Sequence, residues 1–322
     1  MKKLLSLLIF LCPILCLFVA CTKEQANDTM PKTADFKVGK NRFTMTVDGD
    51  EREYFVHVPS NYTGKTATPI VFMLHGTSGD GEEFYTNSGW KEVGEAEGIL
   101  TVFPSSWRYC IITEGEQKNT TKWNSQPAEW QPCAGQKLRD DVKFLSNIIA
   151  EMKAKFSVNA KRIYLVGFSD GGQMAAKCTI DMSDQFAAIV QSASSFYLDT
   201  TYVPKGKIPT TFQVGSADFG PGEVKPAIPM RTFENSLKSR ANRNGRVAYT
   251  HVNSFGLNPN FTIKGDTNVA SIATYTSLTP NSTVNFQFIF VNGLRHSYPN
   301  GTNFPLNASK LNWEWLKQYS LQ

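Results

Sequence analysis

The sequence is poor in features that several classes of protein need. It has 33 Lys and Arg against 28 Asp and Glu, and no basic run is interleaved with aromatic residues, which argues against a nucleic-acid partner. It has four histidines, and no group of potential ligands shows the spacing of a metal site, so neither a metal nor an organic cofactor is expected. Charged residues make up 19% and apolar residues 41% of the 322 residues, which are ordinary values for a globular chain with a sizeable core.

The N-terminus is predicted to be a targeting segment and not part of the fold. A basic start is followed by the apolar run Leu4–Val19, which is shorter than the ~20 residues that a membrane-spanning helix needs. Ala20 then precedes Cys21, and the sequence F-V-A-C resembles a bacterial lipoprotein signal. The resemblance implies that residues 1–20 are removed, that Cys21 is lipidated, and that the protein is exported and anchored to the cell envelope. The alternative is a plain secreted protein in which Cys21 has no role.

Export would allow disulfides to form. Cys110 and Cys133 flank one polar segment and could be bridged, although the sequence alone does not fix the pairing. Cys178 lies in an apolar, helical context and is predicted to be a buried free thiol.

The body of the chain alternates strand and helix patterns. Residues 21–40 are polar and aperiodic and are predicted to be a flexible tether, whereas 41–322 is predicted to be one domain. The predicted strands are 69–74, 99–103, 162–167, 187–190, 210–214 and 284–291, and the predicted helices are 82–97, 138–156, 171–181, 231–240 and 309–318. This order predicts an α/β fold with a mostly parallel sheet and helices on both faces. An antiparallel hairpin around Asp48–Glu51 is predicted at its N-terminal edge, and 105–136 is predicted to be a long loop.

The strongest motif is G-x-S-x-G at 167–171. It stands directly after a predicted strand and directly before a predicted helix, which is the context of a nucleophile elbow. The glycines are needed because the turn is too tight for side chains, and the elbow raises the hydroxyl of Ser169 above the sheet edge. The alternative is a glycine-rich turn without catalysis.

A serine needs a base, and chain order selects one of the four histidines. His57 lies in the edge hairpin, His75 ends an early strand, and His251 lies in what is predicted to be an ordinary strand or loop segment. His296 follows the last predicted strand, where the base falls in the order Ser, Asp or Glu, His. A surface loop histidine is the alternative.

The acid of such a triad should lie between the serine and the histidine, just past a strand. Asp218 fits best because it follows the strand 210–214, while Asp199, Glu223 and Asp266 remain rivals on order alone. A solvated loop carboxylate is the alternative for Asp218.

Further residues are predicted around this centre. The backbone N–H groups of Asp170 and Thr77 would stabilise an oxyanion, and His75 would shape the loop carrying Thr77 or contact substrate, although a structural role for His75 is favoured. Three tryptophans of 105–136 could line a substrate cleft or pack the loop onto the domain, with neither role favoured: Trp107, Trp123 and Trp130.

Several of these segments together resemble one family. The sequence looks like the polyhydroxybutyrate depolymerase and feruloyl esterase group of α/β-hydrolases at the segments L-H-G-T (74–77), D-D-V (140–142), R-I-Y-L-V-G-F-S-D-G-G (162–172), F-A-A (186–188), V-G-S-A-D (214–218), H-S-Y-P (296–299) and W-E-W-L (313–316). The resemblance implies the α/β-hydrolase fold and an extracellular esterase with the triad Ser169, Asp218 and His296.

The expected activity is therefore hydrolysis of a carboxylic ester through an acyl-serine intermediate. Feruloyl or acetyl esters on plant polysaccharide are the first expected substrates, and a polyester such as a polyhydroxyalkanoate is the second. A peptidase on the same fold is a further alternative, as is a surface lipoprotein that binds glycans without catalysis.

Overall fold

The computed structural model describes residues 36–113, 115–126, 131–196 and 201–321. The predicted signal peptide, the lipidation site Cys21, most of the predicted tether, Trp130 and Asp199 lie outside the described residues. The first strand begins at Gly39, two residues inside the predicted tether. Among the described residues, no helix has the length and apolar character to cross a membrane.

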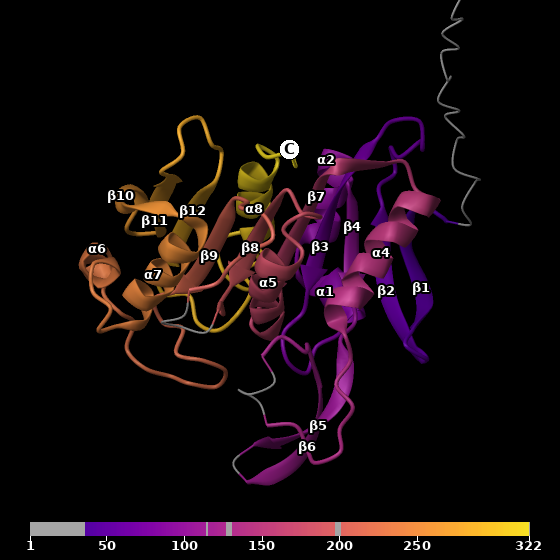
Figure 1. Cartoon of the computed structure of the whole chain (residues 1–322), viewed down its shortest axis with the longest axis horizontal. Helices are drawn as coiled ribbons and strands as arrows, with labels where there is room; N and C mark the ends of the chain where they lie inside the picture. Colours follow the sequence, from indigo (N-terminus) through magenta and orange to yellow (C-terminus); the bar gives the residue numbers. More distant parts are fainter. Residues whose placement is uncertain (1–35, 114, 127–130, 197–200, 322) are drawn as a thin grey trace, which may run out of the picture. The chain divides into compact units, whose positions relative to one another are not determined.

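The fold is built on a ten-stranded sheet with the order β1-β2-β4-β3-β7-β8-β9-β12-β11-β10 (Figure 1). The central six strands are parallel, as the buried apolar runs predicted, and antiparallel pairs close both edges. The strands are β1 (Gly39–Val47), β2 (Asp50–Val58), β3 (Thr68–Leu74), β4 (Leu100–Pro104), β7 (Val158–Phe168), β8 (Ala188–Ser192), β9 (Thr210–Gly215), β10 (Leu257–Asp266), β11 (Ala270–Ser277) and β12 (Asn285–Val291). The predicted N-terminal edge hairpin is confirmed as β1 and β2.

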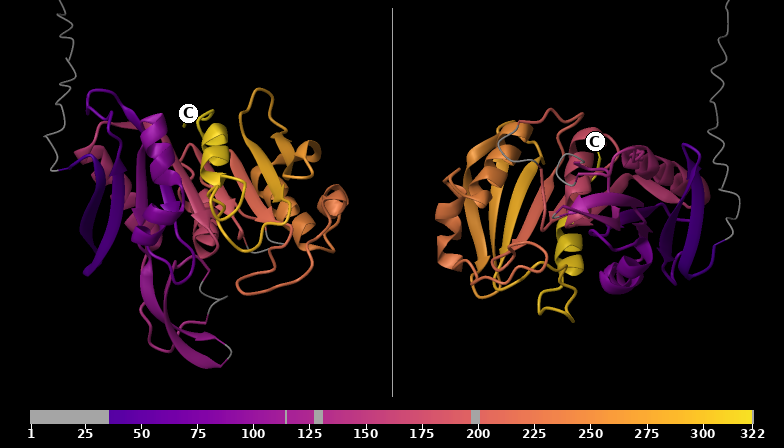
Figure 2. Two further views of the ribbon diagram at one scale, coloured as in Figure 1. Left: turned by 180° about the vertical axis from the view of Figure 1, so that it is seen from behind. Right: turned by 90° about the horizontal axis from the view of Figure 1, so that it is seen from below.

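Helices lie on both faces of the sheet (Figures 1 and 2), and alternate residues of the central strands belong to different core clusters. In β3, Phe72 belongs to the cluster that contains Phe144, whereas Val71 and Met73 belong to the cluster that contains Trp90. One face is covered by α4 (Asp141–Lys155), α5 (Asp170–Asp181), α6 (Phe233–Leu237, preceded by the 3₁₀ turn Met230–Thr232) and α7 (Arg243–Phe255), and the other by α1 (Gly81–Asn87), α2 (Trp90–Glu97) and α8 (Ala308–Leu316). The α/β-hydrolase fold with helices on both faces is confirmed.

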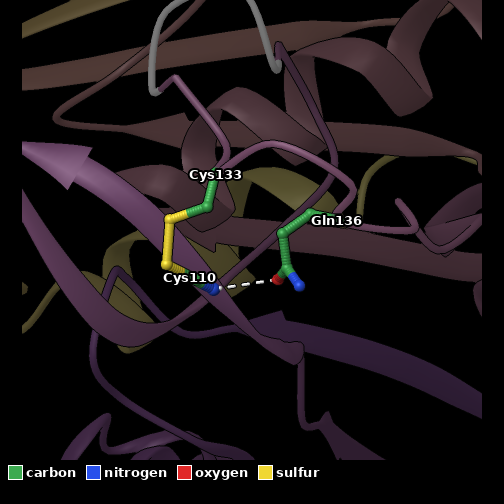
Figure 3. Close-up of a disulfide and its surroundings, with 3 residues drawn as sticks. All are labelled: Cys110, Cys133 and Gln136. Atoms are coloured by element: carbon green, nitrogen blue, oxygen red, sulfur yellow. Dashed lines mark hydrogen bonds between the residues drawn. A yellow bond between two sulfur atoms is a disulfide. The ribbon is translucent and has the colours of Figure 1, made fainter.

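The segment 105–136 is more ordered than predicted. It contains the two-stranded sheet of β5 (Trp107–Thr113) and β6 (Glu116–Lys122), which projects from the body of the domain in Figure 1. The prediction of a loop was wrong because β6 reads E-Q-K-N-T-T-K, which has no apolar alternation. Cys110 and Cys133 are joined by a disulfide that ties the hairpin to the following segment (Figure 3). Cys178 is a buried free cysteine, as predicted.

Three other predictions of local structure were wrong. The single helix predicted for 82–97 is two helices, because the chain turns at Gly89 with φ 79°. The strands β10 and β11 and most of α7 lie in a polar stretch where no element was predicted. His251 consequently lies in the helix α7, not in a strand or loop, where its ring is buried and stacks on Phe286.

Candidate active site

Ser169 occupies a strained turn between β7 and α5. Its backbone has φ 55° and ψ −118°, a combination that non-glycine residues rarely adopt, and its N–H donates to the carbonyl of Ser192 at 2.8 Å. A Cβ atom on Gly167 would lie 1.9 Å from the carbonyl oxygen of Gly171, and one on Gly171 would lie 2.5 Å from that of His75. The motif therefore needs glycine at both ends, for the steric reason expected of a nucleophile elbow.

The three predicted side chains form one hydrogen-bonded chain. Ser169 Oγ lies 2.8 Å from His296 Nε2, and His296 Nδ1 lies 2.9 Å from Asp218 Oδ1. Because the carboxylate can only accept, Nδ1 carries the proton that it donates to Asp218, and Nε2 is left to accept from the serine hydroxyl. The Asp218 side chain is 2% exposed and that of His296 is 13% exposed, so the pair is shielded while the imidazole still faces the site.

Neighbouring parallel strands bring the acid and the imidazole together. Asp218 follows β9 and His296 follows β12, and these strands are paired in the sheet. Their loops are also joined, because Gly293 N–H donates to Ser216 Oγ at 2.8 Å and Ala217 N–H donates to the carbonyl of Leu294 at 3.1 Å. The rival acids lie elsewhere in the described structure: Glu223 pairs with Lys225 on the surface, and Asp266 ends the exposed strand β10.

The imidazole packs on an aromatic support. The ring of Phe168 lies 5.2 Å from that of His296 and 6.1 Å from that of Tyr298. The hydroxyl of Tyr298 accepts from Trp90 Nε1 at 3.0 Å and from Asn312 Nδ2 at 3.2 Å, and burial raises the pKa of this phenol. The support therefore extends from the elbow to α2 and α8, through contacts that no sequence pattern predicted.

Thr77 and Asp170, predicted to supply the oxyanion donors, both line the same pocket as Ser169 and His296. The next two N–H groups of the loop are already used, because Ser78 donates to Thr121 O at 3.0 Å and Gly79 donates to Gly76 O at 3.2 Å. Thr77 therefore remains the candidate donor of this loop.

Lys122, at the end of β6, connects the two candidate oxyanion residues. Its Nζ lies 3.1 Å from Asp170 Oδ1 and donates to Thr77 Oγ1 at 3.2 Å. The other carboxylate oxygen of Asp170 accepts from Trp123 N–H at 2.6 Å. Burial raises the pKa of the Asp170 carboxyl, whereas the charge of Lys122 and these hydrogen bonds act to lower it. Sequence reasoning missed Lys122, because nothing in the sequence of β6 distinguishes it from Lys118.

The pocket at this centre has a volume of about 260 Å³. It is walled by the end of β8, the loop after Asp218, the first turn of α7 and the elbow itself, and its lining residues include Ala193, Phe219, Pro221 and Arg243. Among the described residues, no group of three or more His, Cys, Asp or Glu side chains is placed to hold a metal ion.

The arrangement of a strained serine, a histidine and a buried acid agrees with the comparison to known sequences. The profile of a family described as "Putative esterase" matches residues 46–301. The chain belongs to this esterase family. Its likeness to feruloyl esterases and polyhydroxyalkanoate depolymerases, predicted from the sequence motifs, is also confirmed by the relatives.

Three curated relatives cover parts of this esterase-family chain. It is 26% identical to the "Putative esterase NocK" of Nocardia uniformis subsp. tsuyamanensis over 59% of this chain and 49% of that protein. It is 30% identical to "Feruloyl esterase B" of Piromyces equi (48% and 26% covered) and 26% identical to "Poly(3-hydroxyalkanoate) depolymerase C" of Paucimonas lemoignei (45% and 32% covered). The matches thus span about half or less of the length of these relatives. Among solved structures, the acetyl xylan esterase from Aspergillus awamori superposes with a TM-score of 0.54 at 15% identity, covering 86% of this chain and 99% of that one, which shows the shared fold.

Two residues for which a substrate contact was one of the alternatives, Trp123 and His75, have packing roles in the structure. Trp123 is fully buried, and its indole N–H donates to the carbonyl of His75 at 2.9 Å, so it packs the hairpin onto the sheet. His75 is also fully buried, accepts from Ser106 N–H at 2.9 Å through Nε2, and has its pKa lowered to about 4 by burial. Neither side chain can reach a substrate, and the structural role favoured for His75 is the one observed.

Trp107 is not among the described residues that line the pocket. Its ring lies 4.4 Å from the guanidinium carbon of Arg139, a cation–π contact within the base of the hairpin. The structure therefore gives Trp107 a packing role.

Proposed function

We propose that this chain is a serine esterase that cleaves carboxylic esters through an acyl-enzyme on Ser169. The observation that carries the proposal is the pair of hydrogen bonds that joins Ser169, His296 and Asp218 at 2.8 and 2.9 Å on an elbow turn. Membership of the esterase family supports it.

The geometry assigns one role to each group. Ser169 Oγ attacks the ester carbonyl while its proton passes to His296 Nε2, and the carboxylate of Asp218 stabilises the imidazolium that forms. The N–H groups of Asp170 and Thr77 would stabilise the tetrahedral oxyanion. His296 then returns the proton to the leaving alcohol, and in the second half of the reaction it activates a water that releases the acid.

Labelling with a fluorophosphonate tests the reaction. We expect the full-length protein to be labelled stoichiometrically and the Ser169→Ala variant to remain unlabelled. A folded wild-type protein that takes up no label would support the alternative of a non-catalytic, glycan-binding surface protein. Labelling accompanied by cleavage of peptides but not of esters would support a peptidase on the same fold.

We propose acetyl or feruloyl esters on plant polysaccharide as the substrates, since the curated relatives include proteins named feruloyl esterase and acetylxylan esterase. A polyester is the second candidate, favoured by the relative named poly(3-hydroxyalkanoate) depolymerase. Release of acetate, ferulate and hydroxyacids from acetylated xylan, feruloylated arabinoxylan and polyhydroxybutyrate, measured side by side, decides between them. Hydrolysis of the polyester alone would overturn the polysaccharide assignment.

We also propose that the enzyme is exported and anchored through a lipid on Cys21. The F-V-A-C sequence at the end of the predicted signal motivates this, and the disulfide between Cys110 and Cys133 supports an oxidising compartment. Expression of the full chain and of Cys21→Ser in a bacterial host with an alkyne fatty acid tests it. Lipid incorporation and membrane fractionation should both be lost in the variant, and an unlabelled wild type would rule out the anchor.

A further inference from the structure

A single arginine stands out among the residues that line the pocket of Ser169. Arg243 opens helix α7 and is exposed, so its charge is accessible to a ligand. A cation at this end of a helix is disfavoured by the helix dipole. The helix does not need it as a cap either, since the side chain of Asn242 caps the helix by accepting from Gly245 N–H. Arg243 therefore occupies a position that helix stability does not explain.

The guanidinium is held at the pocket by a strained residue. Arg243 Nη2 donates to the carbonyl of Ala193 at 3.1 Å, and Ala193, directly after β8, has φ 64°, which is unfavourable for any residue with a Cβ. The N–H of Ala193 is fixed by the carbonyl of Gln213 at 2.8 Å. This contact uses one of the five donors of the arginine fork, which leaves the fork able to bind a further acceptor.

The other charges of the pocket are already neutralised. Asp170 is paired with Lys122, and Asp218 is hydrogen-bonded to His296. Within the described parts of the chain, no carboxylate lies within ion-pair distance of Arg243. Among the described residues, the pocket thus presents one guanidinium whose charge no carboxylate matches, and this guanidinium lines the same pocket as the nucleophile Ser169.

We propose that Arg243 forms a subsite for a carboxylate of the substrate, so that the preferred esters carry an acid group on their acyl or alcohol part. This inference rests on the proposed esterase function and narrows its substrate class. A guanidinium fork matches the planar carboxylate and can bind it through two parallel hydrogen bonds. An acidic sugar next to the esterified one and the free acid end of a polyester chain both offer this group.

Two pairs of small substrates test the subsite. The first pair, 4-acetoxybenzoate and 4-acetoxybenzamide, differs by an acid group on the alcohol side. The second pair, the mono-4-nitrophenyl ester of adipic acid and 4-nitrophenyl hexanoate, differs by an acid group on the acyl side. The measured quantity is the ratio of kcat/KM for the acidic ester to that for the neutral ester, compared between variants so that intrinsic reactivity cancels.

We expect Arg243→Met to lower this ratio by about tenfold for at least one pair, which is the size of a lost hydrogen bond to a charged group. Arg243→Lys should recover part of the ratio, and the pair that responds shows on which side of the ester the acid lies. The control Arg231→Met removes an exposed arginine that does not line the pocket and should leave the ratio unchanged.

The failures of the two proposals are distinguishable. If the wild-type protein hydrolyses the neutral esters and Arg243→Met leaves both ratios unchanged, the carboxylate subsite is wrong and the esterase assignment stands. If the wild-type protein hydrolyses none of the four esters and takes up no fluorophosphonate, the esterase assignment fails and the subsite fails with it.

Discussion

The ammonium group of Lys122 lies 3.1 Å from the carboxylate of Asp170, the residue that follows the nucleophile, and the two side chains are only 11% and 1% exposed. The ion pair joins the hairpin β5–β6 to the elbow, and the bond from Lys122 to Thr77 extends it to the loop that carries the second candidate oxyanion donor. Four further bonds fix β6 and the residue after it to this loop: Ser78 N–H to Thr121 O, Ser78 Oγ with Thr120 Oγ1, Thr121 Oγ1 to Gly79 O, and Trp123 Nε1 to His75 O. The segment 105–136 therefore holds in place the loop and the elbow that carry the two candidate oxyanion donors.

We expect Lys122→Met to lower kcat by about tenfold or more with little change in KM, because misplaced oxyanion donors weaken the transition state more than the bound substrate. The variant should also lose roughly 3–5 kcal/mol of unfolding free energy, since it leaves a buried carboxylate unpaired. Steady-state kinetics and urea unfolding measure the two effects.

A double variant separates the effect on the placement of the oxyanion donors from the effect on the free energy of unfolding. Lys122→Met combined with Asp170→Asn removes both charges and should recover most of the lost stability, while kcat stays low because Thr77 remains unsupported. Lys118→Met, which changes an exposed lysine of the same strand, is the matched control. A folded Lys122→Met enzyme with wild-type kcat would contradict this role of the ion pair.

The disulfide is expected to stabilise the hairpin β5–β6, which holds the loop of Thr77 in place. Cys110 and Cys133 are separated by 23 positions, and closing a loop of this size stabilises a fold by about 3 kcal/mol. Replacing both by serine should lower the thermal midpoint and, because β6 carries Lys122, should lower kcat as well. Adding reductant should lower both the thermal midpoint and kcat of the wild type. It should change neither quantity in the double serine variant. A midpoint that reductant leaves unchanged would show that the bridge does not form.

The three candidate triad residues that the structure brings together are each marked in the sequence, either by their immediate neighbours or by their order along the chain. Ser169 is marked by glycines that the elbow needs within five positions, and Asp218 and His296 each follow a recognisable apolar strand. The hairpin β5–β6 was missed because its second strand, E-Q-K-N-T-T-K, is polar throughout and offers no alternating apolar partner to the first strand.

The residues of the site that were missed or left undecided depend on contacts between distant parts of the chain. Lys122 and Tyr298 act through partners far away in the chain, Asp170 and Trp90, and no local pattern records such a pair. Trp123 was considered for a cleft because it lies in a polar segment, yet its indole is fully buried against the strand that ends at His75. Patterns thus predicted which residues follow which strands, but not which side chains the hairpin would bury.

The contact between Asp218 and His296 predicts a large effect of a small substitution. Asp218→Asn keeps the size of the side chain but offers an N–H that favours the tautomer with the proton on Nε2, so the imidazole can no longer accept from Ser169. We expect kcat to fall by about 10⁴, with residual activity from the oxyanion site. Glu223→Gln, an exposed carboxylate on the same loop, is the control and should be neutral. Loss of less than tenfold in Asp218→Asn would point to a different acid.

The two histidines outside the catalytic centre that are fully buried predict how stability depends on pH. His251 donates from Nδ1 to the carbonyl of Val247 at 2.9 Å and stacks on Phe286, and burial lowers its pKa to about 4, as it does for His75. In the unfolded chain both have a pKa near 6.5. Between about pH 6.5 and 4 the unfolded state therefore binds protons that the native state does not, so stability falls as the pH falls through this window and is fully present above it.

Replacing one of these histidines should remove its share of this dependence. His251→Phe suits a site lined by Phe196, Phe255 and Phe286, and it also removes a buried ring nitrogen that finds no hydrogen-bond partner among the described residues. Each histidine contributes a slope of up to about 1.4 kcal/mol per pH unit. Between pH 7.5 and 4.5 the variant should therefore lose about 2–3 kcal/mol less unfolding free energy than the wild type, as measured from urea midpoints. Tyr249→Phe, an exposed change on the same helix, should follow the wild type. Identical pH profiles for the wild type and His251→Phe would mean that the native and unfolded states bind protons at His251 equally, which would contradict the lowered pKa.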